Sequence, residues 1–194
     1  MQSVCVFCGS STGSNAAYTK AAHSLGTTLA EANIRLVFGG GHVGLMGEIS
    51  NAAIAAGGDV IGVIPKFLVE RELAHEGLSD LRIVGSMHER KALMSDLSEA
   101  FIALPGGTGT LEEFFEVLTW AQLGEHKKPC GLLNVAGYYD PLLTVFDRMV
   151  EAGFLSESNR ALLLLVEGDP ERLLQRFDHY EPPKTAKWLD RSET

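Results

Sequence analysis

Apolar residues along this chain fall into two alternating kinds of stretch. Short continuous apolar runs are typical of buried strands, and longer stretches with apolar positions three and four residues apart are typical of amphipathic helices. The predicted strands are Val4 to Phe7, Ile34 to Phe38, Val60 to Ile64, Arg82 to Val84, Phe101 to Leu104, Pro129 to Asn134 and Leu162 to Val166. The predicted helices are Ala16 to Ala32, Leu45 to Ala56, Ser86 to Leu97, Leu111 to Leu123, Tyr138 to Ala152 and Pro170 to Phe177.

This alternation predicts an α/β fold, a doubly wound and Rossmann-like single domain whose mostly parallel sheet carries helices on both faces. We expect the domain to span residues 1–180 and to be followed by a polar tail over residues 181–194. Lys66 to Leu81 carries mixed charges and is expected to be a long connection, which is either functional or mobile. Ligands of such folds bind beyond the carboxyl ends of the strands, where several glycine-rich loops of this chain are predicted to lie.

The most informative of these loops follows the predicted strand Phe101 to Leu104. Gly106, Gly107 and Gly109 stand between that strand and the next helix, so no Cβ atom separates the backbone amides from a ligand. A glycine loop that leads into a helix N-terminus is typical of a phosphate site. Two carboxylates, Glu112 and Glu113, fall in the first helical turn beside the expected anion.

A structural explanation of the same residues stays open. Thr110 and Glu113 have the spacing of a capping box, in which the two residues satisfy each other's backbone amides. Carboxylates in a first turn also suit the helix dipole. The glycines favour a ligand, because a helix cap does not require such a loop.

Two other loops have the same ambiguity. The segment from Cys8 to Ser14 could bond a nucleotide, or it could be an ordinary turn in which Ser14 or Asn15 caps the next helix. Gly39, Gly41 and Gly44 spell G-x-G-x-x-G, but they follow the second predicted strand, and no acidic residue ends the third. We interpret this loop as one that approaches a nucleotide, without assigning NAD.

Arg90 and Lys91 form a cationic pair in the helix that precedes the central strand. They could be a solvated basic face, or they could recognise phosphate or sugar, for which the guanidinium geometry of arginine is suited. The sequence alone leaves both interpretations open.

Composition narrows the class of protein. The chain has 194 residues, of which 45% are hydrophobic and 21% charged, as expected for one globular domain. Its net charge of −9 argues against a nucleic-acid partner. The N-terminus has no signal-peptide pattern, no apolar run is long enough for a membrane span, and the three cysteines imply no disulfide framework, so we expect a cytoplasmic protein. Cys5 and Cys8 lie three positions apart on a strand and should face opposite sides as buried thiols.

Several ordered motifs together resemble the Lonely Guy (LOG) family of cytokinin riboside 5′-monophosphate phosphoribohydrolases, long misnamed lysine decarboxylases. Pro105 to Glu113 fits the family signature P-G-G-x-G-T-x-x-E. Further matches are Cys8-Gly-Ser-Ser11, Val37-Phe-Gly-Gly-Gly41, Gly44-Leu-Met-Gly47, Met87-His-Glu-Arg-Lys91 and Trp120-Ala-Gln-Leu-Gly124. The resemblance extends from residue 3 to about residue 165.

The resemblance implies hydrolysis of the N-glycosidic bond of an N6-modified AMP, which gives the free base and ribose 5-phosphate. It implies that Arg90 and Glu113 are catalytic, and it implies no metal and no cofactor. The substrate site that it implies consists of Glu72, Arg90, Lys91, Gly107, Thr108, Gly109, Thr110, Leu111, Glu112, Glu113 and Thr119. Family members are homodimers, so the resemblance also implies a homodimer.

Two alternatives to this function remain. One is a nucleosidase that acts on AMP or other nucleoside monophosphates, since no motif proves selectivity for an N6-isoprenoid tail. The other is a non-catalytic carrier of a nucleotide or cofactor, which would not need the Arg90 and Glu113 pair. A decarboxylase is disfavoured, because no lysine lies in a recognisable pyridoxal-binding motif.

Overall fold

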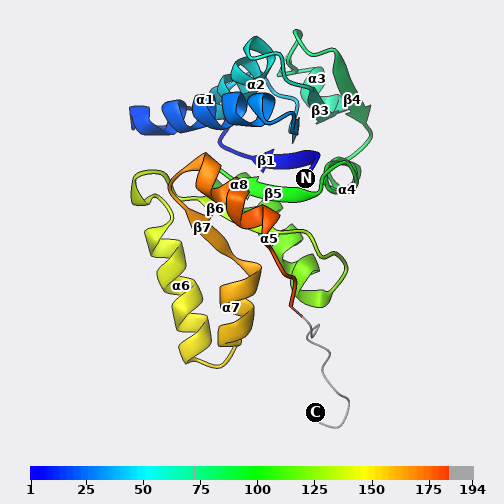
Figure 1. Cartoon of the computed structure of the whole chain (residues 1–194). Helices are drawn as coiled ribbons and strands as arrows, with labels where there is room; N and C mark the ends of the chain where they lie inside the picture. The colour runs from blue at the N-terminus through cyan, green and yellow to red at the C-terminus, as the bar shows by residue number, and fades with distance from the viewer. Residues whose placement is uncertain (72, 184–194) are drawn as a thin grey trace.

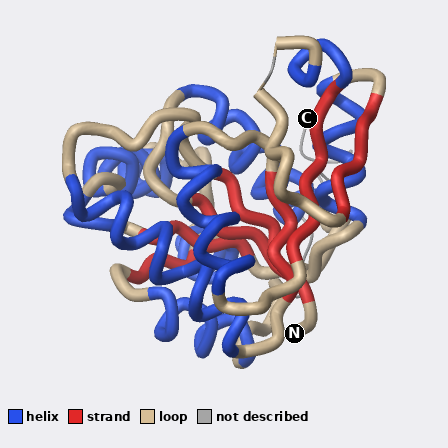
Figure 2. Tube along the Cα trace, turned by 90° about the horizontal axis from the view of Figure 1, so that it is seen from above, coloured by secondary structure: helices blue, strands red, loops and turns tan. Residues whose placement is uncertain are grey.

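A computed structural model describes residues 1–71 and 73–183 and confirms the α/β fold (Figure 1). Seven strands form one sheet, and Figure 2 shows them running between helices. The strands are β1 (Ser3–Phe7), β2 (Arg35–Phe38), β3 (Val60–Pro65), β4 (Asp80–Val84), β5 (Ala100–Ala103), β6 (Cys130–Leu133) and β7 (Leu165–Glu167). The helices are α1 (Ala16–Glu31), α2 (Gly44–Ala55), α3 (Lys66–Val69), α4 (Met87–Asp96), α5 (Thr108–Leu123), the 3-10 turn η1 (Val135–Gly137), α6 (Asp140–Glu151), α7 (Glu157–Leu163) and α8 (Pro170–Asp178).

All neighbouring strands of the sheet are parallel. Their order is β4-β3-β2-β1-β5-β6-β7, so the winding direction reverses between β1 and β5. Val4 of β1 is in register with Leu36 of β2 on one side and with Ala100 of β5 on the other. Ligands of open parallel sheets bind at such a reversal point, beyond the carboxyl ends of the strands. The loops after β1 and β5 therefore flank the expected ligand position.

Each face of the sheet has its own apolar core. Helices α1, α2 and α8 cover one face, and α4, α5, α6 and α7 contribute side chains to the core on the other. Because both faces are covered, the strands are continuous apolar runs rather than alternating ones. Cys5 belongs to one core and Cys8 to the other, which confirms that they face opposite sides. Burial raises the pKa of both thiols well above that of a free cysteine.

The predictions were wrong at three places in the chain. Leu162 and Leu163 were expected to begin the last strand, but they end helix α7, and β7 starts only at Leu165. An apolar run that short can belong to a helix or to a strand, and Ser156 caps this one as a helix by accepting from the N–H of Asn159. The long connection Lys66 to Leu81 contains helix α3 and the beginning of β4. Helix α5 begins at Thr108, earlier than expected.

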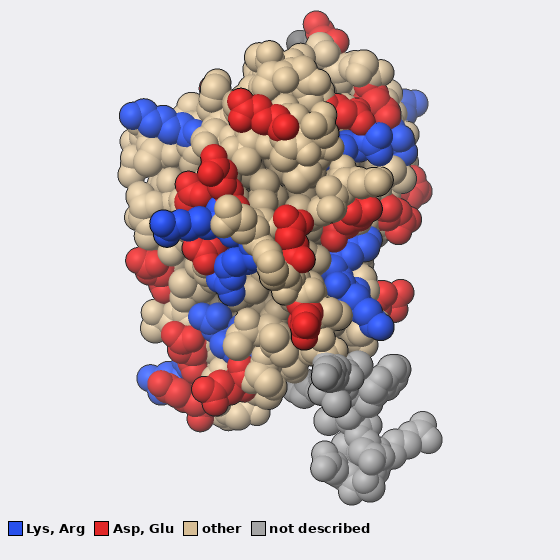
Figure 3. Space-filling view, viewed as in Figure 1, with Lys and Arg blue, Asp and Glu red and all other residues tan. Residues whose placement is uncertain are grey.

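The surface charges and the C-terminal residues do not point to a particular function. Acidic and basic side chains are interspersed on the face of the described chain drawn in Figure 3. None of the described helices has the length and apolarity that a membrane crossing requires. Residues 181–183 lie outside helices and strands, and the rest of the predicted polar tail falls outside the described residues.

Candidate active site

The Arg90 side chain contacts the backbone of β3 and of the loop after β2. Its Nε donates a hydrogen bond to the carbonyl of Val63 in β3 (3.1 Å), and its Nη2 donates to the carbonyl of Gly39 after β2 (3.0 Å). Its Nη1 lies 3.4 Å from Oε1 of Glu113 on α5. The residue is 8% exposed, so the solvated basic face considered above is wrong for Arg90. All three guanidinium nitrogens are thus engaged by the protein itself.

Glu113 faces this guanidinium from the second turn of α5, with a side chain that is 12% exposed. Burial raises the pKa of Glu113 because desolvation disfavours the carboxylate, while the positive charge of Arg90 opposes the rise. A carboxyl group whose pKa is raised towards neutrality is suited to proton transfer at ordinary pH. Arg90 and Glu113, predicted together from the sequence, are therefore brought together by the fold.

Lys91 is also buried, but it is held by two other carboxylates of α5. Its Nζ donates a short hydrogen bond to Glu112 and lies 3.0 Å from Oε2 of Glu116. Burial alone would lower the pKa of Lys91, but the hydrogen bonds to Glu112 and Glu116 reverse this and raise it. The solvated-face interpretation is wrong for Lys91 too. Glu116 was not predicted, although its spacing of four from Glu112 places both on one side of the helix.

The loop after β5 presents backbone amides to an open side. The N–H groups from Gly107 to Thr110 have no acceptor within the part of the chain that the structure describes. A Cβ atom on Gly107 or Gly109 would meet nothing within 4 Å, whereas one on Gly106 would collide with the Thr110 hydroxyl. Four unpaired amides at a helix N-terminus form an anion site when an anion is near.

The capping box considered for Thr110 and Glu113 is not formed. Gly107 is the N-cap of α5 and has no side-chain hydrogen bond, and Glu113 is paired with Arg90 instead. Thr110 is buried and packs against Gly106. By contrast, the loop after β1 does contain an ordinary cap, because Asn15 Oδ1 accepts from the N–H of Ala17 at 2.9 Å.

The remaining predicted site residues are scattered. Thr108 is exposed beside the open amides, and Leu111 is half-buried against the core that contains Phe114. Thr119 is exposed, about two helical turns beyond Glu112 on the same side of α5, so it does not join the Arg90 and Glu113 pair. Glu72 lies outside the described residues.

The glycines after β2 pack against protein atoms. A Cβ atom on Gly39 would collide with the Arg90 guanidinium, and one on Gly44, where φ is +60°, would collide with the backbone of Ser10. Gly39 therefore allows the close approach of Arg90 to its own carbonyl. Close packing against Arg90 and Ser10 therefore explains two glycines of the G-x-G-x-x-G pattern, which the sequence alone could not show.

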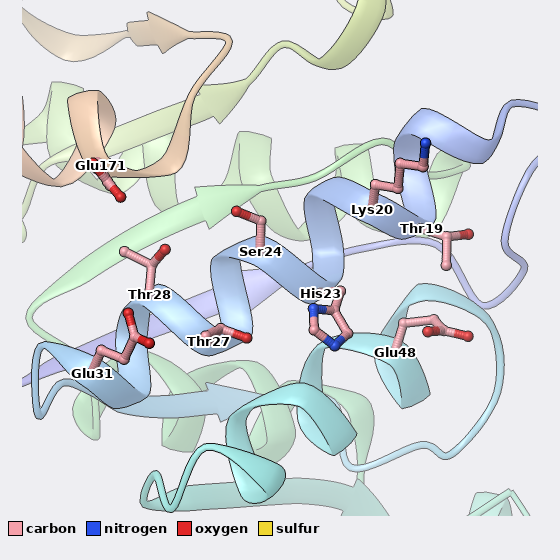
Figure 4. Close-up of a pocket in the computed structure, with 9 residues that line it drawn as sticks. All are labelled: Thr19, Lys20, His23, Ser24, Thr27, Thr28, Glu31, Glu48 and Glu171. Atoms are coloured by element: carbon pink, nitrogen blue, oxygen red, sulfur yellow. The ribbon is translucent and has the colours of Figure 1, made fainter.

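A hollow on the described surface lies away from this pair. It has a volume of about 560 Å³ and lies along α1, between Glu48 of α2 and Glu171 of α8. Figure 4 shows its side chains spread along the length of α1 rather than converging on one point. Within the described ranges, no three His, Cys, Asp or Glu side chains are placed to hold a metal ion. The convergence of charge and open amides, not cavity size, identifies the candidate site.

Known proteins share much of their sequence with this chain. Residues 46–177 match the model of the family described as "Possible lysine decarboxylase". The chain is 52% identical to the cytokinin riboside 5′-monophosphate phosphoribohydrolase LOG1 of Arabidopsis thaliana over 92% of this chain and 84% of that protein. It is 54% identical to the probable cytokinin riboside 5′-monophosphate phosphoribohydrolase LOGL5 of Oryza sativa subsp. japonica, over 96% of this chain and 76% of that protein.

A solved structure with a similar fold is the molybdenum cofactor binding protein of Rippkaea orientalis. The TM-score is 0.68 over 92% of this chain and 97% of that one, but the sequence identity is only 22%. This likeness shows the fold alone. The identity to the plant proteins, above 50% over nearly the whole chain, is what decides the family. The chain belongs to the Lonely Guy (LOG) family of cytokinin riboside 5′-monophosphate phosphoribohydrolases.

Proposed function

We propose that this protein hydrolyses the N-glycosidic bond of cytokinin riboside 5′-monophosphates and releases the free base and ribose 5-phosphate. The observation that carries the proposal is the buried Arg90 and Glu113 pair beside the open amides of α5, in a chain 52% identical to a curated enzyme with this activity. The substrate is small and anionic at one end, which agrees with a local anion site on an acidic chain.

Glu113 is the catalytic carboxylate in this proposal. Breaking the bond between the base and C1′ develops positive charge on the ribose, as in other glycoside hydrolyses. The carboxylate stabilises that charge and takes a proton from the water that attacks C1′, while the base leaves with the electron pair of the broken bond and takes up a proton. The raised pKa of Glu113 supports this role, because a stronger base accepts the proton more readily.

The 5′-phosphate binds at the N-terminus of α5 in this proposal. The amides of Gly107 to Thr110 are unpaired, and the Cβ-free sides of Gly107 and Gly109 leave room for the phosphate. A phosphate held there fixes the ribose relative to Glu113, which lies one turn further along the helix. Glu72, Thr108, Leu111, Glu112 and Thr119 stay in the proposed substrate site on the strength of the family resemblance alone.

Arg90 is assigned to positioning Glu113. Its three guanidinium nitrogens already contact Val63, Gly39 and Glu113, which leaves few donors for a phosphate. Fixed by the carbonyls of Val63 and Gly39, the guanidinium holds the carboxylate in place and limits the rise of its pKa. Lys91 is neutralised by Glu112 and Glu116 and supports the same helix from the side.

The alternative activities have weaker support. An AMP nucleosidase would use the same residues, and only substrate preference separates it from the leading proposal. A non-catalytic carrier shares the fold of the molybdenum cofactor binding protein but has no need of Glu113 buried against Arg90. A decarboxylase that forms a Schiff base needs a neutral lysine, whereas Lys91, the one buried lysine of the described chain, has a raised pKa.

A homodimer and a cytoplasmic location complete the proposal. Exposed apolar side chains such as Leu123 on α5 (55% exposed) and Ile83 on the edge strand β4 (57%) are available for pairing with a second copy. Sedimentation analysis of the purified protein tests the dimer directly. Neither nucleic acid nor a membrane is part of the proposed set of partners.

The test incubates purified protein with isopentenyladenosine 5′-monophosphate, AMP, the riboside without phosphate, and lysine, and measures free base by chromatography. We expect base from the monophosphates but not from the riboside, and no product from lysine. The ratio of isopentenyladenine to adenine decides between cytokinin activation and general AMP cleavage. Absence of base from every substrate, with AMP still bound, would favour the carrier.

A further inference from the structure

Three consecutive carbonyls of the loop after β5 accept hydrogen bonds from outside the loop. The carbonyl of Leu104 accepts from the hydroxyl of Tyr139 (2.6 Å), and that of Pro105 accepts from the N–H of Gly9 (3.1 Å). The carbonyl of Gly106 accepts from the hydroxyl of Tyr138 (2.6 Å). Both tyrosines come from the turn between β6 and α6, which the sequence marked only as the start of a helix.

The two tyrosines are themselves held in place. Asn134 accepts a hydrogen bond from the N–H of Tyr139 (2.7 Å) and donates one to Asp140 (2.7 Å), which fixes the turn between them. The Tyr138 ring packs edge-on against Tyr139 (5.0 Å between centroids) and against Tyr18 of α1 (5.5 Å). Burial raises the pKa of Tyr139, so its hydroxyl remains protonated and able to donate.

The position of a carbonyl determines where the next amide points. The C=O of one residue and the N–H of the following residue belong to one planar peptide unit and point in opposite directions. Tyr138 therefore aims the N–H of Gly107 away from itself when it binds the carbonyl of Gly106. Because glycine populates both signs of φ readily, a peptide between Gly106 and Gly107 could otherwise rotate at little cost. A rotated peptide would present a carbonyl to the open side, where it would repel an anion.

We propose that Tyr138 is a positioning residue that locks the peptide between Gly106 and Gly107, so that the Gly107 N–H faces the substrate's phosphate group. Tyr139 and Gly9 fix the two preceding carbonyls and support this lock. The inference deepens the proposed function, since it rests on the assignment of this loop to the phosphate. The hydroxyl of Tyr138 is the decisive group, and the ring alone does not replace it.

The test compares Tyr138→Phe and Tyr139→Phe with wild type, and uses Tyr180→Phe as a matched control. Tyr180 packs against the core that contains α1 and α8, and within the described chain its hydroxyl makes no hydrogen bond. Loss of the Tyr138 hydroxyl should raise KM for the monophosphate about five-fold, the size of one hydrogen bond, and change kcat less. Phosphate binding distant from the reacting bond acts on ground and transition state alike, which is why KM should carry the effect.

A second measurement does not depend on catalysis. Ribose 5-phosphate is titrated into 15N-labelled protein, and its Kd is followed at the Gly107 amide. The Kd should rise about five-fold in Tyr138→Phe and stay at the wild-type value in Tyr180→Phe. Equal Kd and KM values in Tyr138→Phe and the control would overturn the lock, as would a change confined to the melting temperature. If wild type turns over no substrate, the proposed hydrolase activity is refuted. The lock still stands in that case if the Kd of ribose 5-phosphate rises in Tyr138→Phe and not in Tyr180→Phe.

Discussion

Arg90 and Lys91 are consecutive, equally buried at 8% exposure, and each faces a carboxylate of α5, yet their surroundings differ. Lys91 has two carboxylates for one positive charge, and one of them, Glu112, is 56% exposed. Arg90 is paired with a single carboxylate, that of Glu113, and its other N–H groups donate hydrogen bonds to two backbone carbonyls. The positive charge of Lys91 is fully balanced by Glu112 and Glu116. Glu113, in contrast, has a raised pKa despite its ion pair with Arg90. Of two adjacent cations on α4, Lys91 thus ties α4 to α5, whereas Arg90 positions the carboxylate that we propose to be catalytic.

The largest expected effect comes from Glu113→Gln. The amide keeps the size of the side chain but can neither accept a proton nor offset positive charge on the ribose, so kcat should fall by about 10²–10⁴. Single-turnover release of base from the monophosphate measures the loss. Glu116→Gln is the matched control, because it removes a carboxylate from the same helix but leaves Glu112 on Lys91. Similar losses in both variants would mean that the two carboxylates do not differ as described.

Removal of the arginine charge should reduce both stability and activity. Arg90→Met leaves a buried carboxylate without its partner, which should lower the free energy of unfolding at neutral pH by about 3–5 kcal/mol in urea titrations. Since Arg90 opposes the rise in the pKa of Glu113, its loss raises that pKa further. An ionised Glu113 is required, so activity falls as pH decreases through this pKa, and the acid limb of the kcat profile should move to higher pH.

The same argument fixes how the stability deficit of Arg90→Met depends on pH. A carboxyl group whose folded-state pKa is raised contributes stability at low pH and loses it as pH rises through the folded-state value. The deficit relative to wild type should therefore shrink as the pH is lowered towards and below the usual glutamate pKa of about 4.3. A deficit that is constant with pH would show that Glu113 does not carry the unpaired charge.

A smaller effect is expected at Lys91. Lys91→Met leaves the half-buried Glu116 without its cation, while the exposed Glu112 loses little, so the cost should be about 1–2 kcal/mol. Because the pKa of Lys91 is raised, its contribution is complete below the usual lysine value of about 10.4 and is lost only as pH rises through the folded-state value. Urea titrations of both proteins at neutral and alkaline pH measure this cost and its dependence on pH. A cost as large as that of Arg90→Met would remove the contrast between the two cations.

Much of the fold could be predicted because it follows from local patterns. Parallel strands buried on both faces are continuous apolar runs, and six of the seven were placed within a few residues of their observed bounds. The exception, Leu162 to Val166, is a short apolar run in which a helix ends and a strand begins. No periodicity can divide five apolar residues between two elements.

The candidate site could be predicted only in part. The glycine loop, Arg90 and Glu113 stand in recognisable motifs, so the sequence points to them. That Gly39 makes room for the Arg90 guanidinium, and that Tyr138 binds the Gly106 carbonyl, depend on contacts between segments far apart in the chain. Such contacts leave no local signal. The capping box predicted for Thr110 and Glu113 is wrong for the opposite reason. The local sequence pattern is present, but Glu113 forms an ion pair with Arg90 instead of capping the helix.

The smallest expected effect separates stability from binding at the open amides. In Gly109→Ala the new Cβ meets no protein atom within 4 Å, and alanine in the first turn of α5 should stabilise the protein by about 0.5 kcal/mol. The same methyl group would take up space on the open side where we propose that the phosphate binds, so the Kd of ribose 5-phosphate should rise. Gly168→Ala is the control, since its Cβ would meet only the carbonyl of Asn134 at 3.8 Å and should leave the Kd unchanged. Urea titration and a phosphate-ligand titration of both variants check this. A stabilised Gly109→Ala protein that binds as well as wild type would mean that the open side of these amides does not hold the anion.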